Sequence, residues 1–174
     1  LRIASAFLRL EKARAMADGK SMLDASVDEL QRLATSVESD QPPSIETVQQ
    51  AFGRAHYALA VHHCIQCDCV CCQPSEFENR LQMKRVGHDL NAAAVHLKRG
   101  ALWAGSEPDE AFLKVIDASQ FSAEQLIQAG KAPQGEVARA IRSVRDRLED
   151  LTGRRIMLAP PLTAEDRSGP SVFR

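Results

Sequence analysis

Residues 75–104 read SEFENRLQMKRVGHDLNAAAVHLKRGALWA, and this stretch decides the fold class. Its apolar residues recur at alternating steps of three and four positions, which is the spacing of one buried face of an α-helix. Pro74 stands just before it, and residues 75–78 (SEFE) have the form of a capping box, so the helix should begin near Ser75. The predicted buried face consists of Met83, Val86, Leu90, Ala94, Leu97, Ala101 and Ala104.

The same helix carries a second apolar line on another side. A helix that is apolar on two sides usually touches neighbours on both, and it is therefore expected to be the central helix of the fold. The second line consists of Phe77, Leu81, Ala92, Val95 and Leu102.

Three further helices are predicted around the central one. Ser44 is a good N-cap for a helix that can run to Cys72, and Ser106 is a candidate cap for a helix that ends at Gly130. Pro133 suits the first turn of a last helix, which should stop at Gly153.

The N-terminal segment, residues 3–38, is helical in its spacing but leaves two possibilities open. Gly19 interrupts the pattern, and residues 26–29 (SVDE) form another capping box, which favours two helices. A glycine inside a helix costs only about 1 kcal/mol, so one long helix is equally consistent with the sequence. Pro42 and Pro43 end the segment in either case.

These patterns predict an all-α protein. No segment alternates as a β-strand does, and short loops between long helices favour antiparallel neighbours. We therefore expect an antiparallel up-and-down bundle of four to five helices, formed by residues 1–153. Residues 154–174 contain three prolines and one glycine without periodicity, which predicts an extended or disordered C-terminal tail.

Composition and charge exclude several classes of partner. The formal net charge is −1, and the arginines of the last helix alternate with acidic residues, so neither nucleic acid nor an acidic membrane surface is an expected partner. No apolar run approaches the roughly 20 residues that a membrane-spanning helix needs. Motifs of di-iron bundles, phosphate-binding loops and common hydrolases are also missing, so we expect a non-catalytic protein with no certain cofactor.

The most unusual segment is residues 62–72, HHCIQCDCVCC, in which seven of the eleven residues are potential ligands of soft or borderline metal ions. If the helix continues through it, Cys64, Cys67 and Cys71 gather on one side, away from the apolar face at residues 55–59. They should then be exposed to solvent, or covered by another helix or subunit. Together with His63 they could share Zn²⁺ or Cu(I), for which thiolate is a preferred donor.

An alternative is that these cysteines bind no metal and pack as small apolar side chains. A structural zinc site normally uses two separated ligand pairs, and no second pair is present unless an oligomer supplies it. His56 is a further candidate for a nitrogen ligand, whereas His62 and His88 are expected to be packed and His96 exposed.

The leading functional hypothesis is a helical-bundle protein that acts by association, either as a homo-oligomer or with a partner helix. The alternative is a metal- or thiol-handling bundle that uses residues 62–72. Five cysteines crowded between Cys64 and Cys72 do not suit a disulfide framework, which joins distant segments, so a reducing cytoplasm is the expected location.

Overall fold

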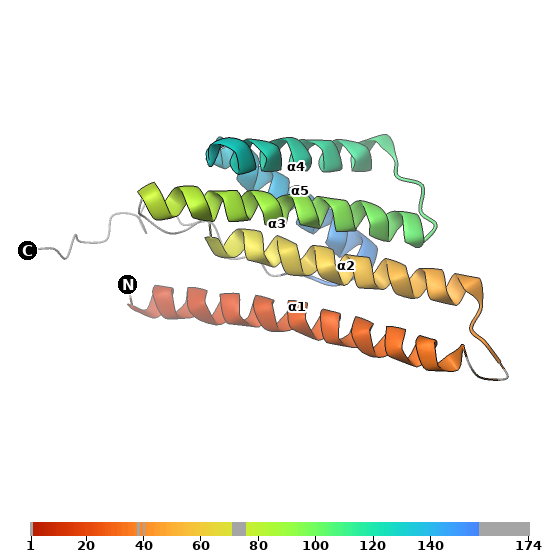
Figure 1. The fold of residues 1–174 in the computed structure, drawn as a ribbon. Coiled ribbons are helices and arrows are strands. Elements are labelled where there is room, and N and C mark those ends of the chain that lie inside the picture. Colours follow the sequence, from red (N-terminus) through yellow and green to blue (C-terminus); the bar gives the residue numbers. More distant parts are fainter. Residues whose placement is uncertain (1, 38, 40, 71–75, 157–174) are drawn as a thin grey trace, which may run out of the picture.

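The computed structural model describes residues 2–37, 39, 41–70 and 76–156, with side chains placed for residues 19–37, 39, 41–67, 80–133 and 135–156. Within these ranges the regular structure is entirely helical, and the helices pack against one another (Figure 1). They are α1 (Arg2–Ser36), α2 (Ile45–Val70), α3 (Glu76–Trp103), α4 (Glu110–Ala129) and α5 (Gln134–Thr152). The predicted all-α class is confirmed. None of the described helices has the length and apolarity needed to cross a membrane.

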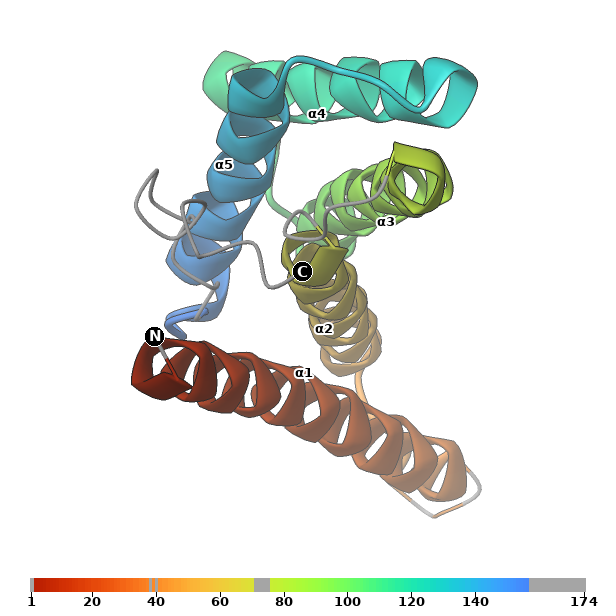
Figure 2. The same cartoon turned by 90° about the vertical axis from the view of Figure 1, so that its left-hand side faces the viewer.

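The helix α3 is central, as its two apolar lines predict. Among the described residues it packs against α2, α4 and α5, whereas α1 packs only against α2. Figure 2 shows α2, α3, α4 and α5 around a common interior, with α1 on the outer side of α2. In the described part of the chain, α1 is therefore attached through α2 alone.

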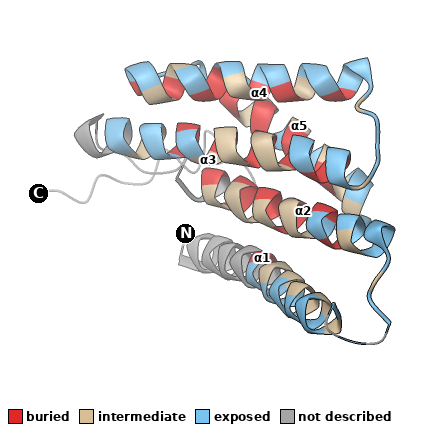
Figure 3. Cartoon of the chain, turned by 45° about the vertical axis from the view of Figure 1, so that its right-hand side comes forward, coloured by how far each residue is buried: buried red, intermediate tan, exposed pale blue. Residues whose placement is uncertain are grey.

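The core lies between α2, α3, α4 and α5 (Figure 3). The predicted face of α3 is buried from Val86 to Ala101, and Met83 packs against it. Two residues of the second line, Leu81 and Leu102, are 61% and 56% exposed, so the prediction of burial is wrong for them. They lie near opposite ends of α3. The largest fully buried apolar side chains are Leu90, Leu97, Ile116, Leu126, Leu148, Val61, Val86, Val137 and Val144.

The start of α2 agrees with its predicted cap, since the Thr47 backbone N–H donates to Ser44 Oγ at 3.2 Å. The N-terminal cap of α4 lies three residues after the predicted cap at Ser106. This cap is Asp109, whose side chain accepts a hydrogen bond from the Phe112 backbone N–H. Pro108 explains the shift, because the residue before a proline is disfavoured in the helical conformation.

Both predicted glycine stops are confirmed. Gly130 and Gly153 follow α4 and α5 with φ of 62° and 64°, a left-handed conformation that glycine adopts without a Cβ clash. After α5 the chain folds back, because Ile156 is buried and its backbone N–H donates to Glu149 Oε1 at 2.7 Å. Residues 157–174, which hold most of the predicted tail, lie outside the described residues.

The N-terminal segment is one continuous helix, which resolves the alternative left open by the sequence. Gly19 lies in its interior and faces α2, where a methyl group at this position would come within 3.1 Å of Ile65 Cδ1. Glycine thus permits a close approach of α1 to α2 rather than a break in the helix. Farther along, Arg54 of α2 donates to both carboxylate oxygens of Glu29, one of them at 3.0 Å, and ties the two helices together.

Candidate functional site

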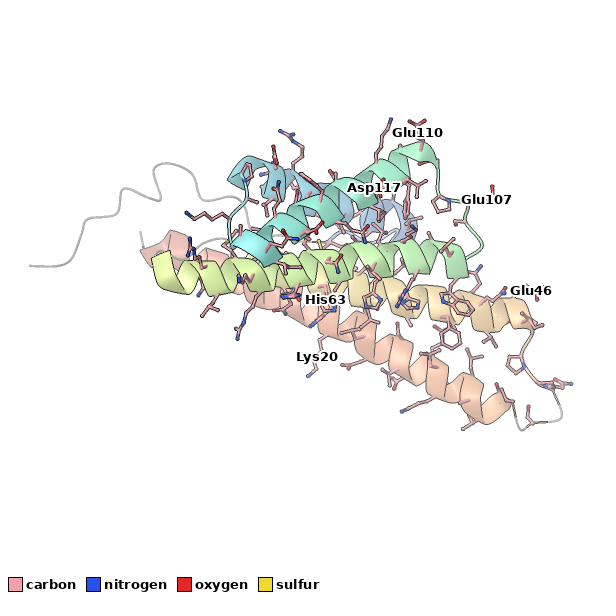
Figure 4. The ribbon with its side chains drawn as sticks, turned by 45° about the horizontal axis from the view of Figure 1, so that its top comes forward. Lys20, Glu46, His63, Glu107, Glu110 and Asp117 are labelled. Atoms are coloured by element: carbon pink, nitrogen blue, oxygen red, sulfur yellow. The ribbon has the colours of Figure 1, made fainter. Side chains whose placement is uncertain are left out.

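A cluster of histidines lies along the contact between α2 and α3. His56 and His63 are seven residues apart on α2, and Asp89 and His96 are seven residues apart on α3. Seven residues are close to two helical turns, so each pair shares one face of its helix. The two faces meet and form two layers, His56 with His96 and His63 with Asp89. His63 marks the position of the cluster beside α3 in Figure 4.

The first layer is a direct contact between two imidazoles. His56 Nδ1 and His96 Nδ1 are 3.0 Å apart, and the ring centroids are 5.2 Å apart with an interplanar angle of 28°. Such a contact needs an N–H on one ring and a lone pair on the other, since two lone pairs or two N–H groups would repel. The pair therefore holds one proton between its two facing nitrogens.

The second layer is an ion pair or hydrogen bond between a histidine and a carboxylate. His63 Nδ1 is 2.9 Å from Asp89 Oδ1, and both side chains are about one quarter exposed. The ring of His63 stacks on His96 with centroids 5.9 Å apart, and His62 meets His63 edge-on at 5.3 Å. The two layers and His62 thus form one contiguous group of four imidazoles and one carboxylate.

The surroundings of the cluster favour neutral imidazoles. Burial lowers the pKa of His56, and the nearby positive charge of Arg99 lowers it further. Burial also lowers the pKa of His96, with further contributions from His56, His63 and Arg99. Since the ordinary histidine pKa is about 6.5, His56 and His96 are mainly uncharged at neutral pH. A neutral imidazole has one lone pair that can accept a proton or bind a metal ion.

The predicted metal ligands do not all belong to this cluster. Cys64 and Cys67 are buried, and their sulfur atoms lie 3.7 Å from the Ile141 carbonyl oxygen of α5 and 3.6 Å from the Val86 carbonyl oxygen of α3. They are covered by other helices, which is one of the two outcomes expected from the helix phase. Both contacts are those of a weak S–H donor with a backbone acceptor.

The structure brings His63 together with Asp89 rather than with the cysteines, and Cys71 lies outside the described residues. The ligand set Cys64, Cys67, Cys71 and His63 therefore stays a prediction. In the part of the chain with placed side chains, no group of three or more histidine, cysteine and acidic residues is arranged to hold a metal ion.

Two predictions about histidines are wrong. His88 was expected to be packed but is exposed, and His96 was expected to be exposed but lies partly buried against α2. The helical phase explains both, because His96 shares a face with Asp89 one heptad earlier, whereas His88 does not. The signal that could have found the cluster is the repeated seven-residue spacing on both helices.

A second notable feature lies at the end of the molecule where α1 ends, α2 begins and α3 ends (Figure 1). Phe52 and Trp103 stack there with ring centroids 5.1 Å apart, and they are 39% and 42% exposed. Gln50 of α2 also bonds the end of α3, since its side-chain amide donates to the Ala104 carbonyl at 3.2 Å. The stacked pair is thus held between α2 and α3 while a large part of it faces solvent.

Other exposed apolar side chains gather at this end. Leu102 adjoins Trp103 on α3, Ile45 begins α2 and is 75% exposed, and Val37 follows α1. In Figure 3 the ends of these helices are mainly in the colour of exposed residues. We refer to Val37, Ile45, Phe52, Leu102 and Trp103 as the apolar end.

Comparisons of the chain with known protein families, with characterised proteins and with solved structures find no significant match.

Proposed function

We propose that this protein is a non-catalytic helical bundle that acts by self-association through the apolar end. The observation that carries the proposal is the exposed, stacked pair of Phe52 and Trp103 at an end of the molecule that also holds other exposed apolar residues. Several exposed apolar side chains at one end of a folded protein favour an interaction site, because association removes their surface from water. Aromatic residues are also enriched among the residues that contribute most to binding.

A second copy of the chain is the partner that these observations favour. The residues of the apolar end come from α2, α3 and the connection that follows α1, so they do not form a single line along one helix. Such a surface fits another folded molecule better than it fits one helix. With a net charge of −1, two copies approach each other with little electrostatic repulsion. A twofold arrangement would place the same surface on both sides of the interface.

The proposal is tested with two matched variants on α3. Leu102→Glu introduces a charge at the apolar end, and Leu81→Glu introduces the same charge at the opposite end of the same helix. The two leucines are similarly exposed, 56% and 61%, so both variants should fold. Sedimentation equilibrium over a wide concentration range would show that the parent and Leu81→Glu associate, while Leu102→Glu is weakened at least about tenfold. Burying an unpaired charge at an interface is expected to cost this much.

Two results would refute self-association through this end. One is a parent protein that stays monomeric at the highest concentration reached. The other is association that Leu81→Glu weakens as much as Leu102→Glu does, which would assign the interface to a different surface or to nonspecific attraction.

The antiparallel, up-and-down topology of the bundle remains part of this proposal. It is supported by the short connections of α1 to α2, α3 to α4 and α4 to α5. We also keep the cytoplasm as the proposed location, which rests on the crowding of five cysteines within one short segment.

Metal or thiol handling through Cys64, Cys67, Cys71 and His63 is the second candidate function, with Zn²⁺ or Cu(I) as the ion. The observation in its favour is that Asp89 binds Nδ1 of His63, since metal-binding histidines are usually oriented by such a carboxylate. Counting reactive thiols in native protein with and without chelator tests it. A gain of two or more reactive thiols with chelator is the expected result, and an unchanged count would reject this function.

A further inference from the structure

The facing nitrogens of His56 and His96 have the separation of two ligands on one metal ion. We propose that these two residues chelate a late first-row divalent metal ion, such as Co²⁺, Ni²⁺, Cu²⁺ or Zn²⁺, through their Nδ1 atoms. This site is independent of the proposed self-association, and it uses neither the cysteines nor His63 as a ligand.

Distance is the first argument. The two Nδ1 atoms are 3.0 Å apart. Imidazole nitrogen binds Zn²⁺ at about 2.0–2.1 Å, so two such bonds at a metal angle of about 90–97° span this separation. The two nitrogens point at each other, so an ion that replaces the shared proton would lie beside the line that joins them, and both rings would have to rotate to direct their lone pairs at it.

The surroundings give the second argument. His56 and His96 are both partly buried, and burial favours the neutral form that metal binding requires. Asp89 lies one layer away, bound to His63, and Arg99 is a nearby positive charge that a bound cation would have to overcome. Because the described residues provide no complete set of three ligands, water would occupy the remaining positions of the ion.

Ligand chemistry decides the class of ion. Imidazole suits Co²⁺, Ni²⁺, Cu²⁺ and Zn²⁺, with affinity rising along the series to Cu²⁺, whereas Mg²⁺ and Ca²⁺ prefer oxygen ligands. The two ligands come from different helices, so a bound ion would connect α2 to α3. Metal binding should consequently raise the melting temperature of the bundle.

The experiment is calorimetric titration of metal-stripped protein with Ni²⁺ and with Co²⁺, using Mg²⁺ as the negative control. The variants are His56→Gln and His96→Gln, and the matched control is His88→Gln, which changes an exposed histidine outside the cluster. We expect one ion per chain for the parent and the control. Each cluster variant should bind at least about tenfold more weakly, the size of loss seen when groups that support a metal site are removed.

Two further measurements keep the test decisive if a variant folds poorly. Ring ¹⁵N resonances of the parent should shift at Nδ1 for two of the five histidines on addition of Zn²⁺, while His88 stays unchanged. The Co²⁺ complex should lack the intense near-ultraviolet absorption of thiolate-to-cobalt charge transfer. Thiolate absorption would place the ion on the cysteines and overturn the proposal, as would parent-like affinity in both cluster variants.

Discussion

Replacing Gly87 with alanine tests the close packing of α3 against α4. A methyl group at Gly87 would lie 2.8 Å from the Ala123 carbonyl oxygen and 2.9 Å from both Leu126 Cβ and Ile127 Cγ1. All three atoms belong to α4, and one of them is backbone, so a side-chain rotation cannot relieve the clash. The two helices would have to separate locally, or α4 would have to shift as a unit.

The expected magnitude follows from two opposing effects. Alanine favours a helix over glycine by about 1 kcal/mol. Forcing an extra methyl group into a well-packed core costs about 1–3 kcal/mol, and a clash with backbone belongs in the upper part of that range. We therefore expect Gly87→Ala to lower the free energy of unfolding by about 1–2 kcal/mol. For a chain of this size each kcal/mol corresponds to about 2–4 °C in melting temperature.

The control is Gly135→Ala, in the first turn of α5, where an added methyl group would meet no other atom within 4 Å. This variant should be about 0.4–1 kcal/mol more stable than the parent, because alanine restricts the unfolded chain. Urea unfolding followed by circular dichroism measures both variants. If Gly87→Ala is as stable as Gly135→Ala, α3 does not approach α4 as closely at Gly87 as the expected clash requires.

Two further predictions concern the core and the link between α1 and α2. Leu90→Ala and Ile141→Ala should each lower the free energy of unfolding by about 2–5 kcal/mol in urea titrations, because both side chains are buried, whereas Leu81→Ala should change it by less than about 0.5 kcal/mol. Hydrogen bonds from Arg54 hold the pKa of Glu29 below its ordinary value. The Glu29 carboxylate therefore binds a proton more readily in the unfolded chain than in the folded one. The stabilisation that Glu29 gains from Arg54 is present above about pH 4.3, and it is lost as the pH falls through the lowered pKa of Glu29. Glu29→Gln should be about 0.2–1 kcal/mol less stable than the parent at pH 7 and equal to it in strong acid, and a difference that persists in acid would contradict this cause.

Helix positions could be predicted from the sequence because their signals are local. Ser44 caps α2, Gly130 ends α4, and the heptad-like face of α3 is buried. Each signal depends on the covalent geometry or spacing of neighbouring residues. Gly19 could not be interpreted in the same way, since its role depends on Ile65, which lies far away in the sequence and close in space.

The candidate site was only partly predictable, for a related reason. Residues 62–72 are rich in potential metal ligands, and this predicts a site at the cysteines. A high density of ligands along one helix does not, however, bring their side chains to a common point. His56 and His96 are 40 residues apart, and each is unremarkable in its own helix. The seven-residue spacing shows which residues share a face on each helix, but the pairing of His56 with His96 depends on how α2 is placed along α3.

That placement also gives the cluster a structural role, whether or not a metal ion binds. Phe52 with Trp103, His56 with His96, and His63 with Asp89 follow one another along the same contact between α2 and α3. A shift of one helical turn would separate all three pairs. It would break the hydrogen bonds of both polar layers, and a bond of this kind contributes about 0.5–1.5 kcal/mol net. Apolar residues alone would tolerate such a shift more easily, because their attraction is not directional. The polar layers therefore fix the register of α2 against α3, and this register is what brings the two Nδ1 atoms together.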